Sequence, residues 1–109
     1  MDLPPPGTPL GQLSHLPDPG GREADWDGAP LFLVRKGRDV RCYVNICPHA
    51  GRALSLPDGR VFVHKGDHII CPVHGATFAL LSGACTGGPA GDPLTAIPVR
   101  IEADDIIAA

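Results

Sequence analysis

Alternating hydrophobic and polar residues between positions 31 and 46 predict a β hairpin. Two apolar runs, LFLV at 31–34 and VRCYVNI at 40–46, flank a glycine-containing turn at residues 36–39. The second run has a period of two, which assigns every other residue to the buried face of a sheet. The residues predicted to be buried are Val40, Cys42, Val44 and Ile46, and the intervening residues 41, 43 and 45 belong to the other face.

Shorter runs of the same kind continue to the end of the chain. Residues 61–63 and 68–70 flank a second turn at 65–67, residues 76–85 hold a further strand and turn, and residues 94–108 hold two short strands. No segment has a helical period longer than two turns. The sequence therefore predicts a single all-β domain over residues 1–109, a small sandwich or barrel of six to nine strands.

The first 20 residues lack this alternation. They are rich in proline and glycine, so we expect an extended or irregular segment that packs on the surface at most. The chain begins without a basic, apolar leader, and no apolar run approaches the ~18 residues of a membrane span. We therefore expect a soluble cytoplasmic protein, in which cysteines are more often metal ligands or thiols than disulfides.

Composition agrees with a loop-rich β protein and narrows the choice of partners. The 109 residues include 14 glycines and 13 prolines, which favours short strands and turns over a helical bundle. The formal net charge is −3, and basic residues form no continuous stripe along the chain. A nucleic acid is therefore not an expected partner. A membrane is not expected either, because no apolar run has the length of a span.

Two short segments each bring a cysteine and a histidine close together. CPH occupies residues 47–49 and CPVH occupies residues 71–74, with 21 residues between His49 and Cys71. In each segment a proline follows the cysteine, where it restricts the shape of the loop. Paired thiols and imidazoles are typical ligands of a transition metal. The candidate ligands are Cys47, His49, Cys71 and His74.

Two kinds of metal site fit these residue types. A structural zinc ion takes four such ligands in a tetrahedron, but zinc modules usually take two cysteines from one segment and two histidines from another. A two-iron cluster instead takes both cysteines on one iron and both histidines on the other. One residue between Cys47 and His49 is a short spacing for two ligands of one ion, which favours the cluster.

The two motifs, together with IICPVHGATFAL and the loop GGPAGDPL at 87–94, resemble Rieske-type [2Fe–2S] ferredoxins over residues 40–101. The resemblance implies antiparallel β layers with a small cluster-binding subdomain at one tip, here within residues 46–90. It implies one [2Fe–2S] cluster per chain. It also implies that Cys47 and Cys71 bind the buried iron, and that His49 and His74 bind the iron nearer to solvent.

This chain departs from the high-potential members of that family at four positions. Arg52 and Val73 stand where those members carry a disulfide, and Ala76 and Phe78 stand where they carry hydroxyl groups. Hydroxyl hydrogen bonds to the cluster raise its reduction potential. We therefore expect a potential near the low end of the Rieske range of about −150 to +300 mV. The 21-residue gap is also longer than in common ferredoxins of this type, and a hairpin at 61–70 accounts for the excess.

The remaining cysteines are expected to be structural. Cys42 lies on the predicted buried face, where it acts as a small hydrophobic residue. Cys85 follows a turn near the loop at 87–94, and we interpret it as a buried thiol in preference to a neighbour of the cluster. A disulfide between Cys42 and Cys85 is not expected in the cytosol.

The leading functional hypothesis is a one-electron carrier and not an enzyme. As a ferredoxin, the chain would contact a reductase and a terminal oxygenase or similar oxidoreductase transiently. One alternative is a small Rieske subunit held permanently in a larger oxidoreductase of the nitrite reductase kind. Others are a zinc-stabilised structural module and a regulatory redox sensor.

Overall fold

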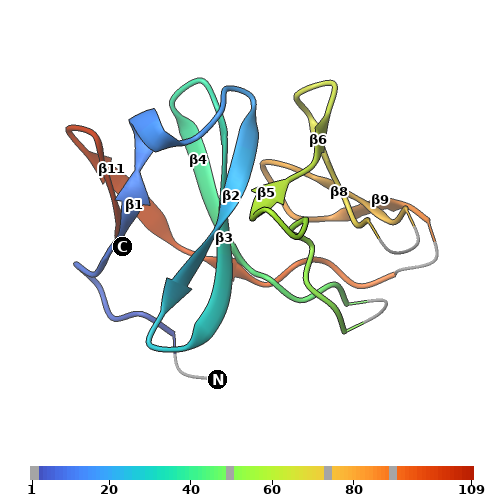
Figure 1. Cartoon of the computed structure of the whole chain (residues 1–109), viewed down its shortest axis with the longest axis horizontal. Helices are drawn as coiled ribbons and strands as arrows, with labels where there is room; N and C mark the ends of the chain where they lie inside the picture. The colour runs from blue at the N-terminus through green and yellow to red at the C-terminus, as the bar shows by residue number, and fades with distance from the viewer. Residues whose placement is uncertain (1–2, 49–50, 73–74, 89–90) are drawn as a thin grey trace.

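The computed structural model describes residues 3–48, 51–72, 75–88 and 91–109. Its described residues form three antiparallel sheets that follow one another as layers (Figure 1). The first sheet contains β1 (Pro9–Gln12), β12 (Asp105–Ala108) and β11 (Val99–Glu102) in this order. The central sheet contains β10 (Ala96–Ile97), β4 (Asp39–Val44), β3 (Ala29–Lys36), β2 (Gly20–Trp26) and β5 (Arg60–Val61). The third contains β6 (Val63–His64), β7 (His68–Ile70), β8 (Thr77–Ala79) and β9 (Cys85–Gly87).

This arrangement confirms the all-β, antiparallel prediction, although the strands are more numerous than expected. Twelve strands and one short 3₁₀ helix, η1 (Leu13–His15), occur among the described residues. None of the described residues forms a helix with the length and hydropathy that crossing a bilayer requires.

The predicted hairpin at 31–46 is confirmed as β3 and β4. These strands pair from Leu31 opposite Val44 to Lys36 opposite Asp39, and a two-residue loop connects them. Gly37 in that loop has a φ of 64°, a left-handed conformation that glycine adopts without steric cost.

The hairpin is buried on both faces, whereas the period of two identified only one of them as buried. One face packs against the first sheet through Leu31, Leu33 and Cys42, and the other packs against the third sheet through Phe32, Val34 and Tyr43. Tyr43 and Asn45, assigned to the other face by the period of two, are 1% and 5% exposed. Tyr43 packs in the cluster shared with the third sheet, and the side chain of Asn45 is hydrogen-bonded to Leu54 and Ser55. Ile46 is 39% exposed because β4 ends at Val44.

The second predicted hairpin is confirmed in part. β6 and β7 pair across the expected turn, and β7 continues its pairing with β8. Arg60 and Val61, however, join the central sheet beside β2 as β5. The chain therefore passes from the central sheet into the third sheet at Phe62.

The N-terminal residues contribute to the core, contrary to the prediction of an irregular surface segment. β1 pairs with β12, and Leu13 and Leu16 are only 5% and 8% exposed. Their side chains pack in the cluster between the first and central sheets. The segment lacks its own hydrophobic period, and it is ordered by the unpaired edge that β12 offers.

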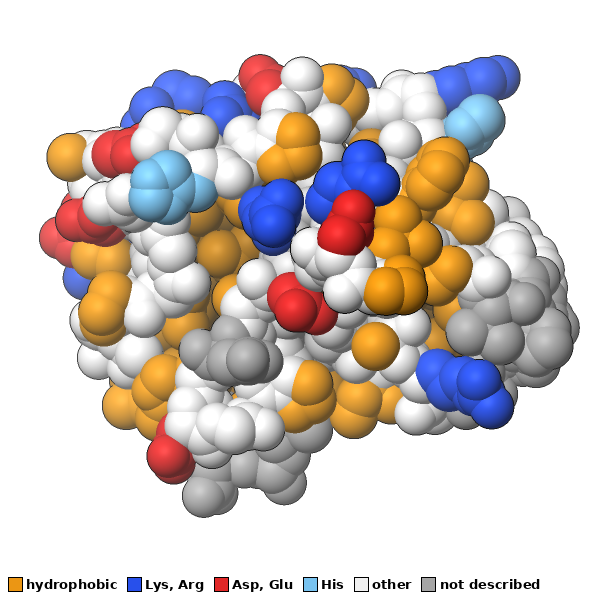
Figure 2. All heavy atoms as spheres, viewed as in Figure 1, with side chains coloured by type: hydrophobic (Ala, Val, Ile, Leu, Met, Phe, Trp, Pro, Cys, Tyr) orange, Lys and Arg blue, Asp and Glu red, His pale blue; other side chains and the backbone are white. Residues whose placement is uncertain are grey.

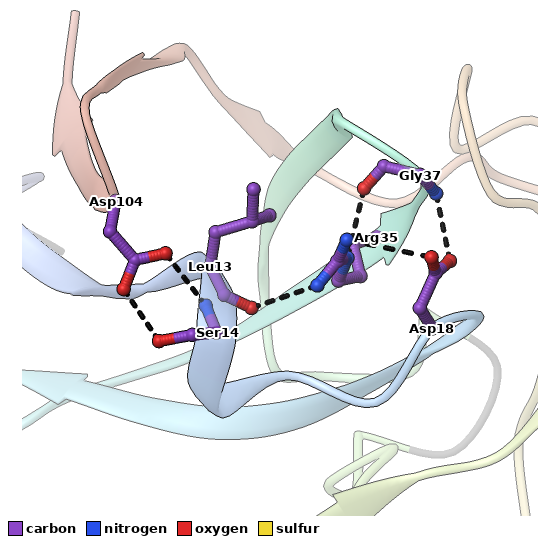
Figure 3. Close-up of polar contacts among 6 residues, drawn as sticks. All are labelled: Leu13, Ser14, Asp18, Arg35, Gly37 and Asp104. Atoms are coloured by element: carbon purple, nitrogen blue, oxygen red, sulfur yellow. Dashed lines mark hydrogen bonds and ion pairs between the residues drawn. The ribbon is translucent and has the colours of Figure 1, made fainter.

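Polar contacts fasten this segment to two turns (Figure 3). Arg35 donates to the carbonyl oxygens of Leu13 (3.0 Å) and Gly37 (2.9 Å). The carboxylate of Asp18 accepts the backbone N–H of Gly37 at 2.8 Å and pairs with Arg35 at 3.5 Å. The side chain of Arg35 therefore joins the segment to the β3–β4 turn.

Ser14 makes the second attachment, to the β11–β12 turn (Figure 3). Its hydroxyl and its backbone N–H both donate to the carboxylate of Asp104, at 2.5 and 2.9 Å. The hydrogen bond from the Ser14 hydroxyl is the main reason that the pKa of Asp104 lies below its ordinary value. The ionised form of Asp104 is therefore the form that holds the segment in place.

We expect Asp104→Asn to lower stability at neutral pH but not in acid. Because folding lowers the pKa of Asp104, its contribution is complete above the unfolded-state pKa of about 3.9 and is lost as pH falls through the lower folded-state value. Urea midpoints of wild type and variant should differ at pH 7 and converge near pH 3. Asp105→Asn is the control, because Asp105 is the next residue in the chain and its carboxylate accepts a long hydrogen bond, 3.4 Å, from Gln12. Equal midpoints for wild type and Asp104→Asn at pH 7 would contradict this expectation.

Candidate metal centre

The tertiary structure brings the two candidate cysteine ligands into one buried core. Cys47 lies three residues after the end of β4, and Cys71 directly follows β7. Both are 0% exposed, and both belong to the apolar cluster between the central and third sheets. The other two candidates, His49 and His74, lie outside the described residues, as does Val73. Among the residues that are described, no group of three or more potential ligands occurs, because half of the predicted set is missing from them.

The segment that carries Cys47 is closed by two backbone hydrogen bonds. We call residues 47–52 the first loop. The N–H of Cys47 donates to the carbonyl of Arg52 at 2.7 Å, and the N–H of Gly51 donates to the carbonyl of Cys47 at 2.8 Å. Gly51 has a φ of 66°, which favours glycine at this position.

The segment that carries Cys71, residues 71–76 or the second loop, repeats this pattern. The N–H of Cys71 donates to the carbonyl of Ala76 at 2.8 Å, and the N–H of Gly75 donates to the carbonyl of Cys71 at 3.0 Å. Gly75 has a φ of 72°, close to that of its counterpart in the first loop. Each cysteine therefore begins a loop of six residues with the same backbone hydrogen bonds.

This donor set fits a bound iron–sulfur group. Thiolates are soft ligands that suit iron–sulfur clusters and zinc. A buried thiolate is costly unless a metal or a positive charge compensates it. Two fully buried cysteines on matching loops in one apolar cluster therefore have the character of metal ligands.

A third loop, the predicted GGPAGDPL segment at 87–94, packs on the second loop at Gly88. A Cβ atom at Gly88 would lie 2.6 Å from the Cα of Ala76, so only glycine permits this approach. The hydroxyl groups of Thr77 and Thr86 lie 2.9 Å apart and join β8, which follows the second loop, to β9, which precedes the third. The start of the predicted GGPAGDPL loop is thus in contact with the second loop, while Pro89 and Ala90 are outside the described residues.

The positions that bear hydroxyl groups in high-potential relatives are buried here without one. Ala76 and Phe78 are both 0% exposed, and the intervening Thr77 directs its hydroxyl to Thr86. Neither Ala76 nor Phe78 has a side-chain donor for a sulfur atom in the site. These buried side chains agree with the low reduction potential expected from the sequence, which stays a prediction.

Cys42 and Cys85 occupy different environments and are not joined by a disulfide. Cys42 is 1% exposed in the cluster on the opposite face of β4, and burial raises the pKa of its thiol to about 12. Its predicted structural role is consistent with this site. Cys85 is half-buried in β9 opposite Phe78, and it packs against the cluster that contains Cys47 and Cys71. It is therefore less buried, and nearer to the candidate ligands, than the sequence suggested.

The exposed surface beside the loops is partly apolar. Pro72 and Arg52 are exposed, and Pro48 is half-buried. Figure 2 shows hydrophobic side chains gathered over the part of the molecule that holds β5 and β6, beside atoms that are not described. In the segment between those strands, Phe62 is 51% exposed.

Sequence reasoning missed Asn45. The period of two placed it on the face opposite Cys42, yet it is 5% exposed and is the one polar residue among the fully buried described residues. Its position two residues before Cys47 was the available signal. A polar residue between the end of a strand and a ligand segment can hydrogen-bond to that segment and hold it in position.

Comparison with known sequences gives one family. The family model of the Rieske [2Fe-2S] domain matches residues 8–98. The 3-phenylpropionate/cinnamic acid dioxygenase ferredoxin subunit of Escherichia coli (strain K12) is 32% identical over 89 residues, covering 81% of this chain and 80% of that protein. The cytochrome b6-f complex iron-sulfur subunit of Chlorobaculum thiosulfatiphilum is 29% identical over 98 residues. This chain spans only 50% of that subunit.

Solved structures agree with the sequence relatives. The ferredoxin of carbazole 1,9a-dioxygenase from Nocardioides aromaticivorans IC177 superposes with a TM-score of 0.80 at 30% identity, covering 94% of this chain and 97% of that chain. A chain in a complex of reduced oxygenase and oxidized ferredoxin in carbazole 1,9a-dioxygenase superposes with a TM-score of 0.79 at 25% identity. In that comparison 93% of this chain and 90% of the other chain are covered.

Proposed function

Because the chain belongs to the Rieske [2Fe–2S] domain family and is an electron carrier, not an enzyme, we propose that Cys47, His49, Cys71 and His74 hold its [2Fe–2S] cluster. The full burial of Cys47 and Cys71 on two loops with the same hydrogen bonds is the observation that carries this assignment. In the family, two cysteines bind one iron and two histidines the other. The proposed domain is the whole chain, with residues 46–90 as the cluster-binding region.

The bound cluster supplies one-electron redox chemistry, and this chain's residues provide its setting. Leu54, Phe78 and Leu80 are each 0–1% exposed and belong to the same apolar cluster as the two cysteines. They keep water from the cysteine side of the site, so electrons would enter and leave on the side of the two histidines. Because Gly88 has no side chain, the third loop lies against the second loop at Ala76 and covers the second loop there.

The proposed partners are a reductase that supplies the electron and a terminal oxygenase that accepts it, each bound transiently in the cytoplasm. The similarity to a ferredoxin found in complex with an oxygenase supports this proposal. Coverage also supports it, because this chain spans 80–97% of the dioxygenase ferredoxins but only 50% of the cytochrome b6-f subunit. Small interfaces are typical of transient redox encounters.

Metal and spectroscopic analysis of the purified protein tests the proposal. Two irons and two sulfides per chain, with a Rieske-type EPR signal only after reduction by dithionite, are expected. A colourless protein with one tightly bound zinc ion would overturn it. Recovery of the native protein only as a fixed part of a larger complex would overturn the transient role while leaving the cluster assignment in place.

We expect Ala76→Ser to raise the reduction potential of the cluster. The substitution places a hydroxyl where high-potential relatives carry one, and a hydrogen bond to a charged group is worth about 1.5–3 kcal/mol. For a one-electron couple this corresponds to an increase of about 60–130 mV. A spectroelectrochemical titration measures the change, with Ala79→Ser, half-buried at the end of β8, as the control. An unchanged potential in Ala76→Ser would show that position 76 does not reach the cluster.

A further inference from the structure

The two cysteine loops differ in how their ends are joined. At the second loop the flanking residues Ile70 and Thr77 pair directly, because β7 and β8 form a regular antiparallel ladder. At the first loop the corresponding residues, Ile46 and Ala53, belong to no strand of the described structure. The backbone hydrogen bonds inside the two loops match, but the ladder that closes the second loop has no equivalent at the first.

The side chain of Asn45 closes the first loop instead. Its Oδ1 accepts the backbone N–H of Leu54 at 2.7 Å and that of Ser55 at 3.3 Å. Its Nδ2 donates to the hydroxyl of Ser55 at 3.0 Å. A side-chain amide has the same donor and acceptor groups as a peptide bond, so Asn45 does here what a neighbouring strand does at the second loop.

Both ends of this brace are attached to the central sheet. The backbone N–H of Asn45 donates to the carbonyl of Pro30 in β3 at 3.0 Å. The hydroxyl of Ser55 donates to the carboxylate of Glu23 in β2 at 2.9 Å. The first loop is therefore held by a continuous set of hydrogen bonds that runs from β3 through Asn45 and Ser55 to β2.

We propose that Asn45 is the positioning residue of the first loop, and that it holds Cys47 in place relative to Cys71. The inference rests on the proposed function in one respect, which is that Cys47 is a ligand of the cluster. The hydrogen bonds of the Asn45 side chain go to the backbone N–H groups of Leu54 and Ser55 and to the Ser55 hydroxyl, so Asn45 acts through the backbone that carries Cys47. Its loss affects the first loop and leaves the β7–β8 ladder of the second loop intact.

Loss of the Asn45 side chain has a specific physical cost. Leu54 is 0% exposed, so its N–H would be left buried without an acceptor. The first loop then relieves this cost by opening to water. Asn45→Ala, in its oxidised form, should therefore release iron to a ferric chelator about tenfold faster than wild type, or more. The reduction potential and EPR g values should also change, because the position of Cys47 relative to Cys71 changes.

Hydrogen exchange of the backbone amides separates the two loops. In Asn45→Ala we expect the amides of Cys47 and Gly51 to exchange about tenfold faster or more, while those of Cys71 and Gly75 change little. Asn45→Asp keeps the oxygen that accepts from Leu54, so it should restore slow exchange in the first loop to a large extent. This second variant also keeps the test valid if Asn45→Ala does not fold.

Tyr43→Phe is the matched control. Tyr43 is 1% exposed, and its hydroxyl donates to the carbonyl of Leu80 at 2.6 Å in the same core cluster. Its loss should lower global stability without a difference between the loops.

The proposal is overturned if Asn45→Ala accelerates exchange in both loops equally and leaves iron release and potential as in Tyr43→Phe. Absence of iron from the wild-type protein would instead overturn the proposed function, because the contrast in exchange between the loops is measured independently of iron.

Discussion

Replacement of Cys71 by alanine is expected to abolish cluster binding while the chain keeps its β fold. Cys71 is 0% exposed, lies at the end of β7, and is one of two buried thiols on matching loops. A [2Fe–2S] cluster of this type needs both cysteines on one iron, so the loss of either removes half of the protein ligands of that iron. The same result is expected for Cys47→Ala.

Iron and sulfide content, the visible spectrum and far-UV circular dichroism measure the two parts of this expectation. The cysteine variants should contain less than about a tenth of the wild-type iron, because the remaining ligands cannot hold a cluster. Their β-sheet signal should stay, because the first and central sheets have their own apolar cluster. Cys42→Ala is the matched control, since Cys42 is equally buried but lies in that other cluster. Full iron content in Cys71→Ala would refute the ligand assignment.

Gly21→Ala is expected to unfold the domain or nearly so. Gly21 lies in β2 between β3 and β5, where a Cβ atom would lie 2.4 Å from the carbonyl oxygen of Leu33 and 2.5 Å from Cγ1 of Val34. Neither neighbour can give way cheaply, because one is backbone and the other is fully buried. We expect a loss of about 3 kcal/mol or more, a large part of the stability of a domain of this size.

Urea unfolding followed by circular dichroism measures this loss. Gly91→Ala is the control, because no atom of the described residues lies within 4 Å of a Cβ built there. The control should unfold at the wild-type midpoint, whereas Gly21→Ala should be unfolded at much lower urea or already in buffer. A wild-type midpoint for Gly21→Ala would mean that β2 and β3 can separate locally without cost.

Local pattern was sufficient where neighbouring residues determine the structure. The β3–β4 hairpin followed from alternation around a glycine turn, and the β6–β7 pairing followed from the turn at 65–67. The cofactor followed from the cysteine and histidine types and their spacing, which the family match then supported. These features depend on side chains that are close together in sequence, so their physical causes can be read there.

Local pattern failed where a distant segment provides the partner. Alternation in β4 predicts which residues share a face, but not that layers cover both faces and bury Tyr43. Residues 9–16 have no hydrophobic period of strand type, and they are ordered because β12 and the apolar core accept them. Val61 likewise left the predicted hairpin and, with Arg60, joined the central sheet, because β2 has an edge free to pair with them.

The sequence by itself determined the strand-and-turn character of the chain, the central hairpin and the residues suited to hold a [2Fe–2S] cluster. Only the tertiary structure decided that Cys47 and Cys71 enter one buried cluster, and that Asn45 replaces a missing strand at the first loop. The reason is that burial and part of the hydrogen bonding at these positions come from residues distant in the chain, such as Glu23 and Pro30, whose approach depends on the packing of the layers.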